Sequence, residues 1–297
     1  KDAVVEELRA GIEKQLAAAK VDLYRGTGVV CGEHLVKVMP GEEEVTADYI
    51  LLAAGSEPSS LPIPGMDLPG VKNSTQMLEE ECVPDRLVII GGGVIGMEFA
   101  TVYNDLGCQV TVLEAMDKIL PGMDKEISQN LKMIMKKRGV DIHTGATVSS
   151  VEKMGDGTYL CRYTEKEKNC EAPAALILSA VGRRPLSRGL FSEDMQERIE
   201  MERGRVLVNE RYETSVPGIY AIGDLIGGVC LAHVAAAEGC QAASAMFPEL
   251  KGKDMTVIPS CVYTDPEIAC AGLTADEAKA AGIDTATGKY IMSVNGK

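Results

Sequence analysis

The sequence is poor in the residues and spacings that bind metals. It contains 3 histidines, and its 9 cysteines include no C-x-x-C pair, no C-x₄-C pair and no cysteine–histidine spacing suited to zinc. We therefore expect no metal site. An odd number of cysteines at irregular spacing is typical of reduced thiols, which favours a cytoplasmic location.

Basic residues and long apolar runs are also scarce. The chain has 30 lysines and arginines against 44 aspartates and glutamates, a net charge of −14, which argues against nucleic acid and anionic membranes as partners. No apolar run reaches the roughly 18 residues that cross a bilayer, and the first residues lack the apolar core of a signal peptide. We expect a soluble chain of about two domains. Its start at Lys1 instead of Met indicates a processed, cut or incompletely represented protein.

A glycine-rich turn follows a short apolar segment near residue 90. Residues 87–90 (LVII) have the composition of a buried parallel strand, and 94–106 read as a helix. Gly91 would allow the tight turn, Gly93 would let the backbone approach a pyrophosphate, and Gly96 would let the helix lie close to the strand. The phosphate charge would then lie at the helix N-terminus, where free N–H groups and the dipole favour an anion.

The unit continues into a second strand that ends in an acid. Gly107 is suited to end the helix, and residues 108–114 form the next predicted strand, which closes with Glu114, 18 residues after Gly96. Glu114 would accept hydrogen bonds from the adenosine ribose hydroxyls, whereas a 2′-phosphate would face its carboxylate. The sequence therefore predicts NAD(H) over NADP(H). Lys118 is the one nearby cation that would weaken this inference.

Hydrophobic periodicity and turn residues predict the other elements. An amphipathic helix over 1–20 would place Val4, Val5, Leu8, Ile12 and Leu16 on one face. Further helices are predicted over 124–138, 231–247 and 274–281, with a Pro-rich linker over 57–70. Predicted strands cover 22–30, 34–39, 44–54, 148–153, 158–163, 174–181, 205–208, 218–222, 257–263 and 289–294.

Several separated motifs together resemble one family. They are Y-I-L-L-A-A-G-S over 49–56, G-G-G-V-I-G-M-E over 91–98, A-V-G-R-R-P over 180–185, T-S-V-P-G-I-Y-A-I-G-D over 214–224 with C-L-A-H over 230–233, and I-P-S-C-V-Y-T-D-P-E over 258–267. These stretches are similar to motifs of the FAD-dependent pyridine nucleotide disulfide oxidoreductases, most closely the dihydrolipoamide dehydrogenase branch. Ala54 stands where that family usually has threonine.

The resemblance implies a fold and a domain organisation. We expect an α/β chain with two Rossmann-like FAD/NAD(P)-binding domains of the three-layer β/β/α type, plus the start of an α+β dimer-interface domain. Residues 1–83 and 212–255 would form a partial FAD-binding domain that lacks its first βαβ unit. Residues 84–211 would form the NAD-binding domain, and residues 256–297 would begin the interface domain.

The resemblance also implies the cofactor contacts. The NAD positions would be Gly91, Gly92, Gly93, Val94, Ile95, Gly96, Met97, Glu98, Glu114, Val148 and Gly182. The FAD positions would be Gly28, Ala54, Gly55, Ser56, Asp224, Cys230, Leu231, Ala232 and His233. Within these sets, Glu98 would lie near the nicotinamide and flavin, Asp224 would bond the ribityl or phosphate-linked hydroxyls, and the helix starting near Leu231 would point its positive end at the flavin's pyrimidine carbonyl.

Two alternatives follow from what the chain does not contain. The family's C-x₄-C redox disulfide and its His/Glu acid–base pair are both absent, so we expect no catalytic residue in this sequence. The parent would be a homodimer that passes electrons from a dithiol through FAD to NAD⁺ and serves a lipoyl-bearing multienzyme complex. Within the family, the alternatives are a mercuric reductase, a transhydrogenase, and an NADH oxidase or peroxidase. Alternatively, the chain is a non-catalytic NAD(H)-binding fragment that holds FAD weakly or not at all.

Overall fold

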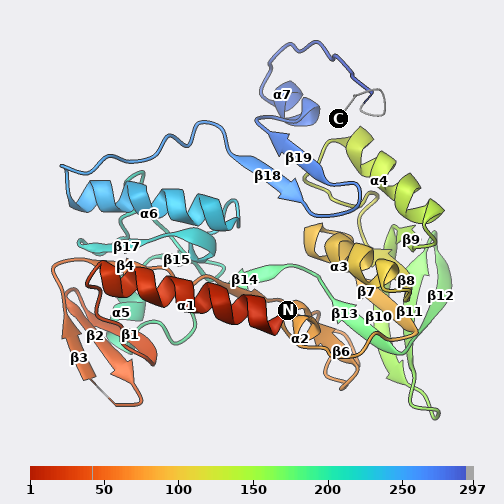
Figure 1. Ribbon diagram of the computed structural model, residues 1–297, viewed down its shortest axis with the longest axis horizontal. Coiled ribbons are helices and arrows are strands. Elements are labelled where there is room, and N and C mark those ends of the chain that lie inside the picture. The colour runs from red at the N-terminus through yellow and green to blue at the C-terminus, as the bar shows by residue number, and fades with distance from the viewer. Residues whose placement is uncertain (42, 292–297) are drawn as a thin grey trace. The chain divides into compact units, whose positions relative to one another are not determined.

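The computed structural model describes residues 1–41 and 43–291. The chain divides into two compact units (Figure 1). One unit comprises residues 1–55 and 185–253, and the other comprises residues 56–184 and 254–297. These borders lie at other residues than the predicted domain borders, so the assignment of cofactors to domains stays a prediction. Within the described ranges, no helix combines the length and the apolar character needed to cross a membrane.

The second unit is built on a five-stranded parallel sheet. Its strand order is β6 (Val71–Asn73), β13 (Leu176–Ser179), β7 (Arg86–Ile90), β8 (Gln109–Glu114) and β9 (Asp141–Thr144). Four consecutive residues of β7 are buried, as predicted for a strand covered on both faces. Because all five strands are parallel, their carboxyl ends meet at one edge of the sheet, where ligands bind in folds of this type.

The two faces of this sheet are covered by different layers. Leu87 and Ile89 pack with α3 (Val94–Asp105) and α4 (Lys125–Lys137) in one core. Val88 and Ile90 point the other way, into a core that they share with an antiparallel meander. The meander consists of β10 (Ala146–Lys153), β11 (Tyr159–Glu165) and β12 (Lys168–Ala174). This arrangement confirms the predicted three-layer β/β/α fold.

The ends of α3 and α4 follow from local signals in the sequence. The Asp124 side chain accepts a hydrogen bond from Glu126 N and caps α4, as the predicted helix over 124–138 requires. Gly107 and Gly139 follow the two helices at φ +88° and φ +93°, backbone conformations that favour glycine. Lys136 and Lys137 lie in the last turn of α4, where positive charge is favourable.

The C-terminal segment packs on the same unit. It contains the hairpin β18 (Pro259–Val262) and β19 (Ile268–Ala271), and then α7 (Ala275–Ala280). Val262 is fully buried in the core that α3 and α4 share. The Arg138 guanidinium also donates to the Asp265 carbonyl at 2.8 Å and to its carboxylate at 2.7 Å. This C-terminal segment is too small to fold alone, and it obtains its core from the helices that cover the five-stranded parallel sheet.

The first unit holds α1 (Asp2–Ala18), an antiparallel sheet β1 (Thr27–Gly32), β2 (Leu35–Met39) and β3 (Glu43–Thr46), and a parallel pair β4 (Ile50–Leu52) and β17 (Ile219–Ala221). It also contains α5 (Glu193–Arg198), β15 (Met201–Glu202), β16 (Arg205–Val206), the 3₁₀ turn η1 (Gly223–Leu225) and α6 (Ala232–Met246). Its main core joins Val30 and Leu52 to Met195 of α5 and Ile219 of β17. The short elements α2 (Ser74–Leu78), β5 (Ser56–Pro58) and β14 (Arg183–Pro185) complete the chain, with β5 and β14 paired.

Several sequence expectations need correction. The helix at the start forms, but none of its residues is buried, and Val4, Leu8 and Ile12 are 60%, 64% and 58% exposed. The predicted linker over 57–70 packs its apolar side chains on the meander core instead of crossing freely. The elements that were not predicted are the strands β5, β6, β9, β12, β14, β15 and β19 and the helices α2 and α5. Of the predicted strand over 289–294, residues 289–291 are not a strand and residues 292–294 lie outside the described part of the chain.

Candidate functional site

A cavity of about 630 Å³ opens at the carboxyl ends of the parallel strands. Its walls come from the turn after β7, the end of β8, the start of β10 and the turn after β13. Of the predicted NAD residues, those lining it are Gly91, Gly93, Val94, Ile95, Glu114, Val148 and Gly182. Sequence reasoning missed the other lining residues Leu61, Ile63, Ile90, Leu113, Ala115, Pro121, Ala146, Thr147, Ala180 and Val181. The structure thus brings together residues from six separate stretches of sequence.

Each glycine of the turn has its own steric reason. Gly91 has φ +108°, and a Cβ there would lie 2.4 Å from the Ala180 carbonyl oxygen. A Cβ on Gly96 would lie 2.0 Å from the Gly91 carbonyl oxygen, so α3 lies directly against the turn. A Cβ on Gly93 would meet no protein atom within 4 Å. Gly93 is therefore the position in the turn whose missing side chain leaves room for something other than the protein.

The first turn of α3 presents backbone donors to the cavity. Gly93 is the N-cap of this helix, and no side chain caps it. Gly93, Val94 and Ile95 all line the cavity. Because the first N–H groups of a helix have no acceptor within the helix, this end attracts an anion. The arrangement suits a diphosphate lying across the glycine turn.

Glu114 is buried at the end of β8 and is held by two backbone amides. Glu114 is 7% exposed. Its Oε2 accepts a hydrogen bond from Gly92 N at 2.5 Å, and its Oε1 accepts one from Met116 N at 2.7 Å. A Cβ on Gly92 would lie 3.0 Å from the Glu114 Cβ, so glycine at 92 leaves room for this carboxylate. The two amides fix its orientation at the cavity wall.

The remaining predicted NAD residues lie behind the cavity wall or turn away from it. Gly96 and Met97 are buried between α3 and the sheet. Glu98 accepts a hydrogen bond from Tyr263 N at 2.9 Å through Oε1 and so ties α3 to the segment after β18. Lys118, the cation that could favour a 2′-phosphate, donates to the Met123 carbonyl at 3.0 Å and does not line the cavity.

The wall formed by residues 146–148 is held in place by a histidine that bridges two sheets. His143 lies in β9, and its Nδ1 is 2.8 Å from Glu165 Oε2 of β11 while its Nε2 is 2.9 Å from Asp141 Oδ2. A neutral imidazole carries one N–H group, so only the protonated ring donates to both carboxylates. Burial opposes the charged ring, but the hydrogen bonds and charges of Asp141 and Glu165 outweigh it and raise the pKa of His143 above 6.5.

This bridge predicts a pH dependence of stability. The pKa of His143 is higher in the folded chain than in the unfolded chain, so its stabilising effect is complete below the unfolded pKa and is lost as pH rises through the folded pKa. We expect the difference in unfolding free energy between wild type and His143→Gln to be largest near pH 5.5 and to shrink toward pH 8. Urea unfolding at several pH values measures it, with the exposed His34→Gln as the control. A difference that grows with pH would contradict this role.

The predicted FAD residues divide between two places and a connecting segment. Gly28 and Ala54 line a second cavity of about 470 Å³ in the first unit, together with Val30, Leu52 and Leu190. Asp224 lies in η1, which follows β17. Cys230 precedes α6, Leu231 is its N-cap without a side-chain cap, and Ala232 and His233 form its first turn. Ile222 N donates to the Leu52 carbonyl, so the turns after β4 and β17 begin at the same edge of the parallel pair.

Gly55 and Ser56 lie in the connecting segment. Gly55 has φ +72°, a backbone conformation that favours glycine. The Arg183 guanidinium donates to Ser56 Oγ at 2.8 Å and to the Ser56 carbonyl at 2.7 Å. Ser56 therefore supports the segment that carries Leu61 and Ile63 along the wall of the 630 Å³ cavity.

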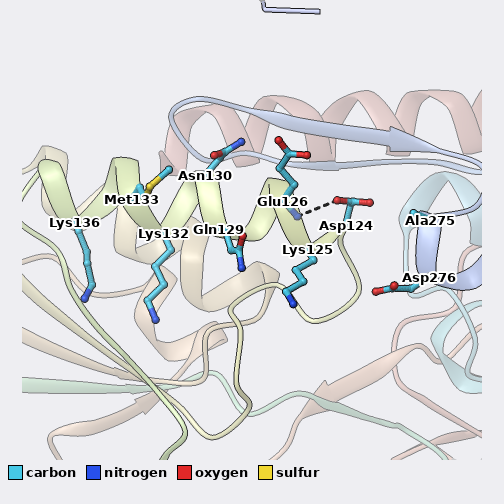
Figure 2. Close-up of a pocket in the computed structure, with 10 residues that line it drawn as sticks. All are labelled: Asp124, Lys125, Glu126, Gln129, Asn130, Lys132, Met133, Lys136, Ala275 and Asp276. Carbon is cyan, nitrogen blue, oxygen red and sulfur yellow. Dashed lines mark hydrogen bonds between the residues drawn. The ribbon is translucent and has the colours of Figure 1, made fainter. Parts of the chain in front are cut away.

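A larger hollow of about 750 Å³ lies on the outer side of α4 near the start of α7 (Figure 2). Lys125, Lys132 and Lys136 point to one side of the helix there. Its charged lining residues are balanced, because Asp124, Glu126 and Asp276 also line it. The hollow therefore selects no sign of charge, and it lies away from the strand ends where the glycine turn is found.

Comparison with known proteins assigns the family. The model of the pyridine nucleotide-disulphide oxidoreductase family matches residues 3–239, and the model of that family's dimerisation domain matches residues 258–297. A dihydrolipoyl dehydrogenase of Bacillus subtilis is 36% identical over 315 residues, which cover 100% of this chain and 65% of that protein. A dihydrolipoyl dehydrogenase of Thermus scotoductus is 38% identical over 303 residues, covering 100% and 64%.

Among solved structures, the chain is similar to the HOCl-induced flavoprotein disulfide reductase RclA from Escherichia coli. The TM-score is 0.84 at 28% identity, with 95% of this chain and 64% of the other covered. The chain thus spans somewhat less than two thirds of the relatives that it matches. The glycine turn, the three layers of the second unit and the hairpin β18–β19 all fall within the matched residues. The chain therefore belongs to the pyridine nucleotide-disulphide oxidoreductase family.

Proposed function

We propose that this chain is the NAD(H)-binding part and a portion of the FAD-binding part of a dihydrolipoyl dehydrogenase-type flavoprotein. The whole protein would oxidise a dithiol through a protein disulfide and FAD and would reduce NAD⁺. It would act as a homodimer, with residues 256–297 as the start of the interface domain, and would serve a lipoyl-bearing complex. The similarity to two dihydrolipoyl dehydrogenases supports this choice over the other members of the family.

The observation that carries the proposal is the cavity at the glycine turn. It lies at the carboxyl ends of parallel strands, it is bordered by the uncapped first turn of α3, and its wall holds the buried Glu114. The turn supplies donors for the diphosphate, and Glu114 supplies an acceptor for the ribose. The apolar side chains of Leu61, Ile63 and Val148 form a slot for the base, which is the third feature that a dinucleotide requires. When bound, the pyridine nucleotide accepts or donates a hydride, while the residues of this chain bind and orient it.

The same wall supports NAD(H) over NADP(H). Glu114 is fixed by Gly92 N and Met116 N, so its carboxylate is not free to turn away from a 2′-phosphate. Lys118 is occupied by the Met123 carbonyl. A phosphate placed on the adenosine 2′-oxygen would therefore meet a buried negative charge without compensation.

Isothermal titration of the purified chain tests this preference. We expect NADH to bind at least about 30-fold more tightly than NADPH, which corresponds to about 2 kcal/mol. Equal affinities would contradict the role proposed for Glu114. If neither nucleotide bound, the proposal that this cavity is a dinucleotide site would be wrong. ATP titrated under the same conditions is the control for adenine recognition that lacks the nicotinamide half.

The first unit is suited to part of a flavin dinucleotide. The turns after β4 and β17 share one edge of a parallel pair, Asp224 lies in one of these turns, and the uncapped start of α6 follows. We propose Gly28, Ala54, Gly55, Ser56, Asp224 and residues 230–233 as the residues that would hold FAD. The carboxylate of Asp224 would accept from hydroxyl groups, and the N-terminus of α6 would favour negative charge.

A second candidate function rests on the cysteines. No two of the 9 cysteines are five positions apart, so this sequence contains no C-x₄-C pair that could exchange electrons with a dithiol. We propose that the chain by itself carries no catalytic residue and acts as an NAD(H)-binding fragment. Visible absorbance of the purified chain separates the candidates: a stoichiometric flavin band would count against the fragment, and a colourless chain that still binds NADH would support it.

A further inference from the structure

A carboxylate occupies the middle of the buried face of α6. The buried residues of this helix are Val234, Glu238 and Ala242, which recur every four residues and so lie on one face. Glu238 is 8% exposed, between neighbours that are 4% and 0% exposed. An acid at such a position loses its hydration, which is unfavourable unless another group compensates. The sequence of α6, which is rich in alanine, gives no packing reason for a glutamate there.

The compensating group is the backbone amide of Gly223. Gly223 N donates to Glu238 Oε2 at 2.6 Å across 15 residues of sequence. Gly223 adopts φ +69°, and a Cβ there would lie 3.1 Å from the Ala235 Cβ. The helix thus packs so closely on this turn that only glycine fits without displacement, and the carboxylate accepts a hydrogen bond from the amide at the start of the turn.

The turn held in this way is the one that carries Asp224. Burial raises the pKa of Glu238, and the nearby charge of Asp224 raises it further, against the opposing effect of the bond from Gly223 N. Two acids are therefore kept close together although their charges repel. Such a costly arrangement is expected where the geometry of the turn serves a ligand.

We propose that Glu238 is the positioning residue of the Gly223–Asp224 turn, which it fixes so that Asp224 and the start of α6 face a flavin dinucleotide. This inference rests on the proposed flavin site. Glu238 is buried and bonds to the backbone of the turn. It acts by holding one backbone N–H group, and through that group it sets the direction of the next residue.

The test compares Glu238→Met with Glu238→Gln in the full chain. Methionine has a similar length and suits the apolar stripe, but it accepts no strong hydrogen bond, whereas glutamine keeps an acceptor oxygen. In the cofactor-free chain we expect amide hydrogen exchange over 219–226 to become about tenfold faster in Glu238→Met and to stay near wild type in Glu238→Gln. Glu249→Met, at an exposed site after α6, is the matched control.

Titration with FAD gives the second measurement. We expect FAD affinity to fall about tenfold in Glu238→Met and to stay within about threefold of wild type in Glu238→Gln, with NADH affinity unchanged in both. Equal FAD affinity in wild type and Glu238→Met would overturn the positioning role and leave the flavin site intact. A wild-type chain that binds no FAD would overturn both. Loss of folding in Glu238→Met, seen as amide protection lost throughout residues 1–55 and 185–253, would make Glu238 a structural residue and overturn the proposal.

Discussion

Replacing Gly96 by alanine should lower the unfolding free energy of the second unit by about 3 kcal/mol and abolish measurable NADH binding. The added Cβ would lie 2.0 Å from the Gly91 carbonyl oxygen and 3.1 Å from its carbonyl carbon. Both are backbone atoms of a turn fixed by the bond from Gly91 N to the Leu113 carbonyl at 2.8 Å, so no side chain can move to relieve the contact. The helix α3 must shift away from β7, and its first amides then leave the cavity.

Thermal unfolding and NADH titration measure this effect. A loss of about 3 kcal/mol corresponds to a midpoint lower by roughly 10 °C for a unit of this size. Gly93→Ala is the informative control, because its Cβ would meet no protein atom within 4 Å. We expect Gly93→Ala to unfold near the wild-type midpoint and to bind NADH about tenfold more weakly. If Gly93→Ala bound NADH as tightly as wild type, the result would contradict the proposal that the diphosphate lies against this turn.

The second large effect is expected at Glu114. Its removal in Glu114→Ala leaves the buried amide of Gly92 and the partly buried amide of Met116 without the acceptors that they now have, and also removes the proposed ribose acceptor. We expect NADH affinity to fall at least about 30-fold, or about 2 kcal/mol, while NADPH affinity changes little. The NADH-to-NADPH preference would then approach unity.

Glu114→Gln separates the two roles of this side chain. Glutamine keeps an acceptor oxygen for one amide but has no negative charge, so repulsion of a 2′-phosphate should decrease more than ribose binding. We expect an intermediate loss of NADH affinity together with a gain in NADPH affinity. Titration of both nucleotides into both variants measures these effects. An unchanged preference in Glu114→Ala would assign the discrimination to another residue.

The parts of the site that local sequence signals predicted are formed by neighbouring residues, whereas Val148 and Gly182 were predicted from the family resemblance. The strand at 87–90, the glycine turn and Glu114 belong to one continuous βαβ unit, and each has a local signal in composition or spacing. Leu61 and Ile63 line the same cavity but lie between prolines, where no periodicity shows. Because the composition of residues 57–70 is typical of a linker, the sequence did not indicate that this segment packs on the meander.

One strand was missed because the turn before it carries no sequence signal. Strand β12 follows a two-residue turn in which Lys166 and Glu167 both have positive φ, at 50° and 63°. Such turns usually contain glycine or asparagine, so two charged residues gave no sign of a hairpin. Glu238 and His143 were missed for a different reason, because their partners Gly223 and Glu165 lie 15 and 22 residues away in the sequence. Only the folded chain shows these distances in space.

The pairing of β5 with β14 bears on how such a chain is assembled from modules. Residues 56–184 form one uninterrupted stretch that lies, in sequence, between the two segments of the first unit, residues 1–55 and 185–253. Strands β5 and β14 stand at the two ends of this stretch and are hydrogen-bonded to each other, so the two ends lie side by side. An insertion with this geometry leaves no gap in the chain that flanks it. An insertion whose ends adjoin alters the surrounding framework little, but an exchange of this stretch would have to include the hairpin β18–β19 as well, because that hairpin takes its core from α3 and α4.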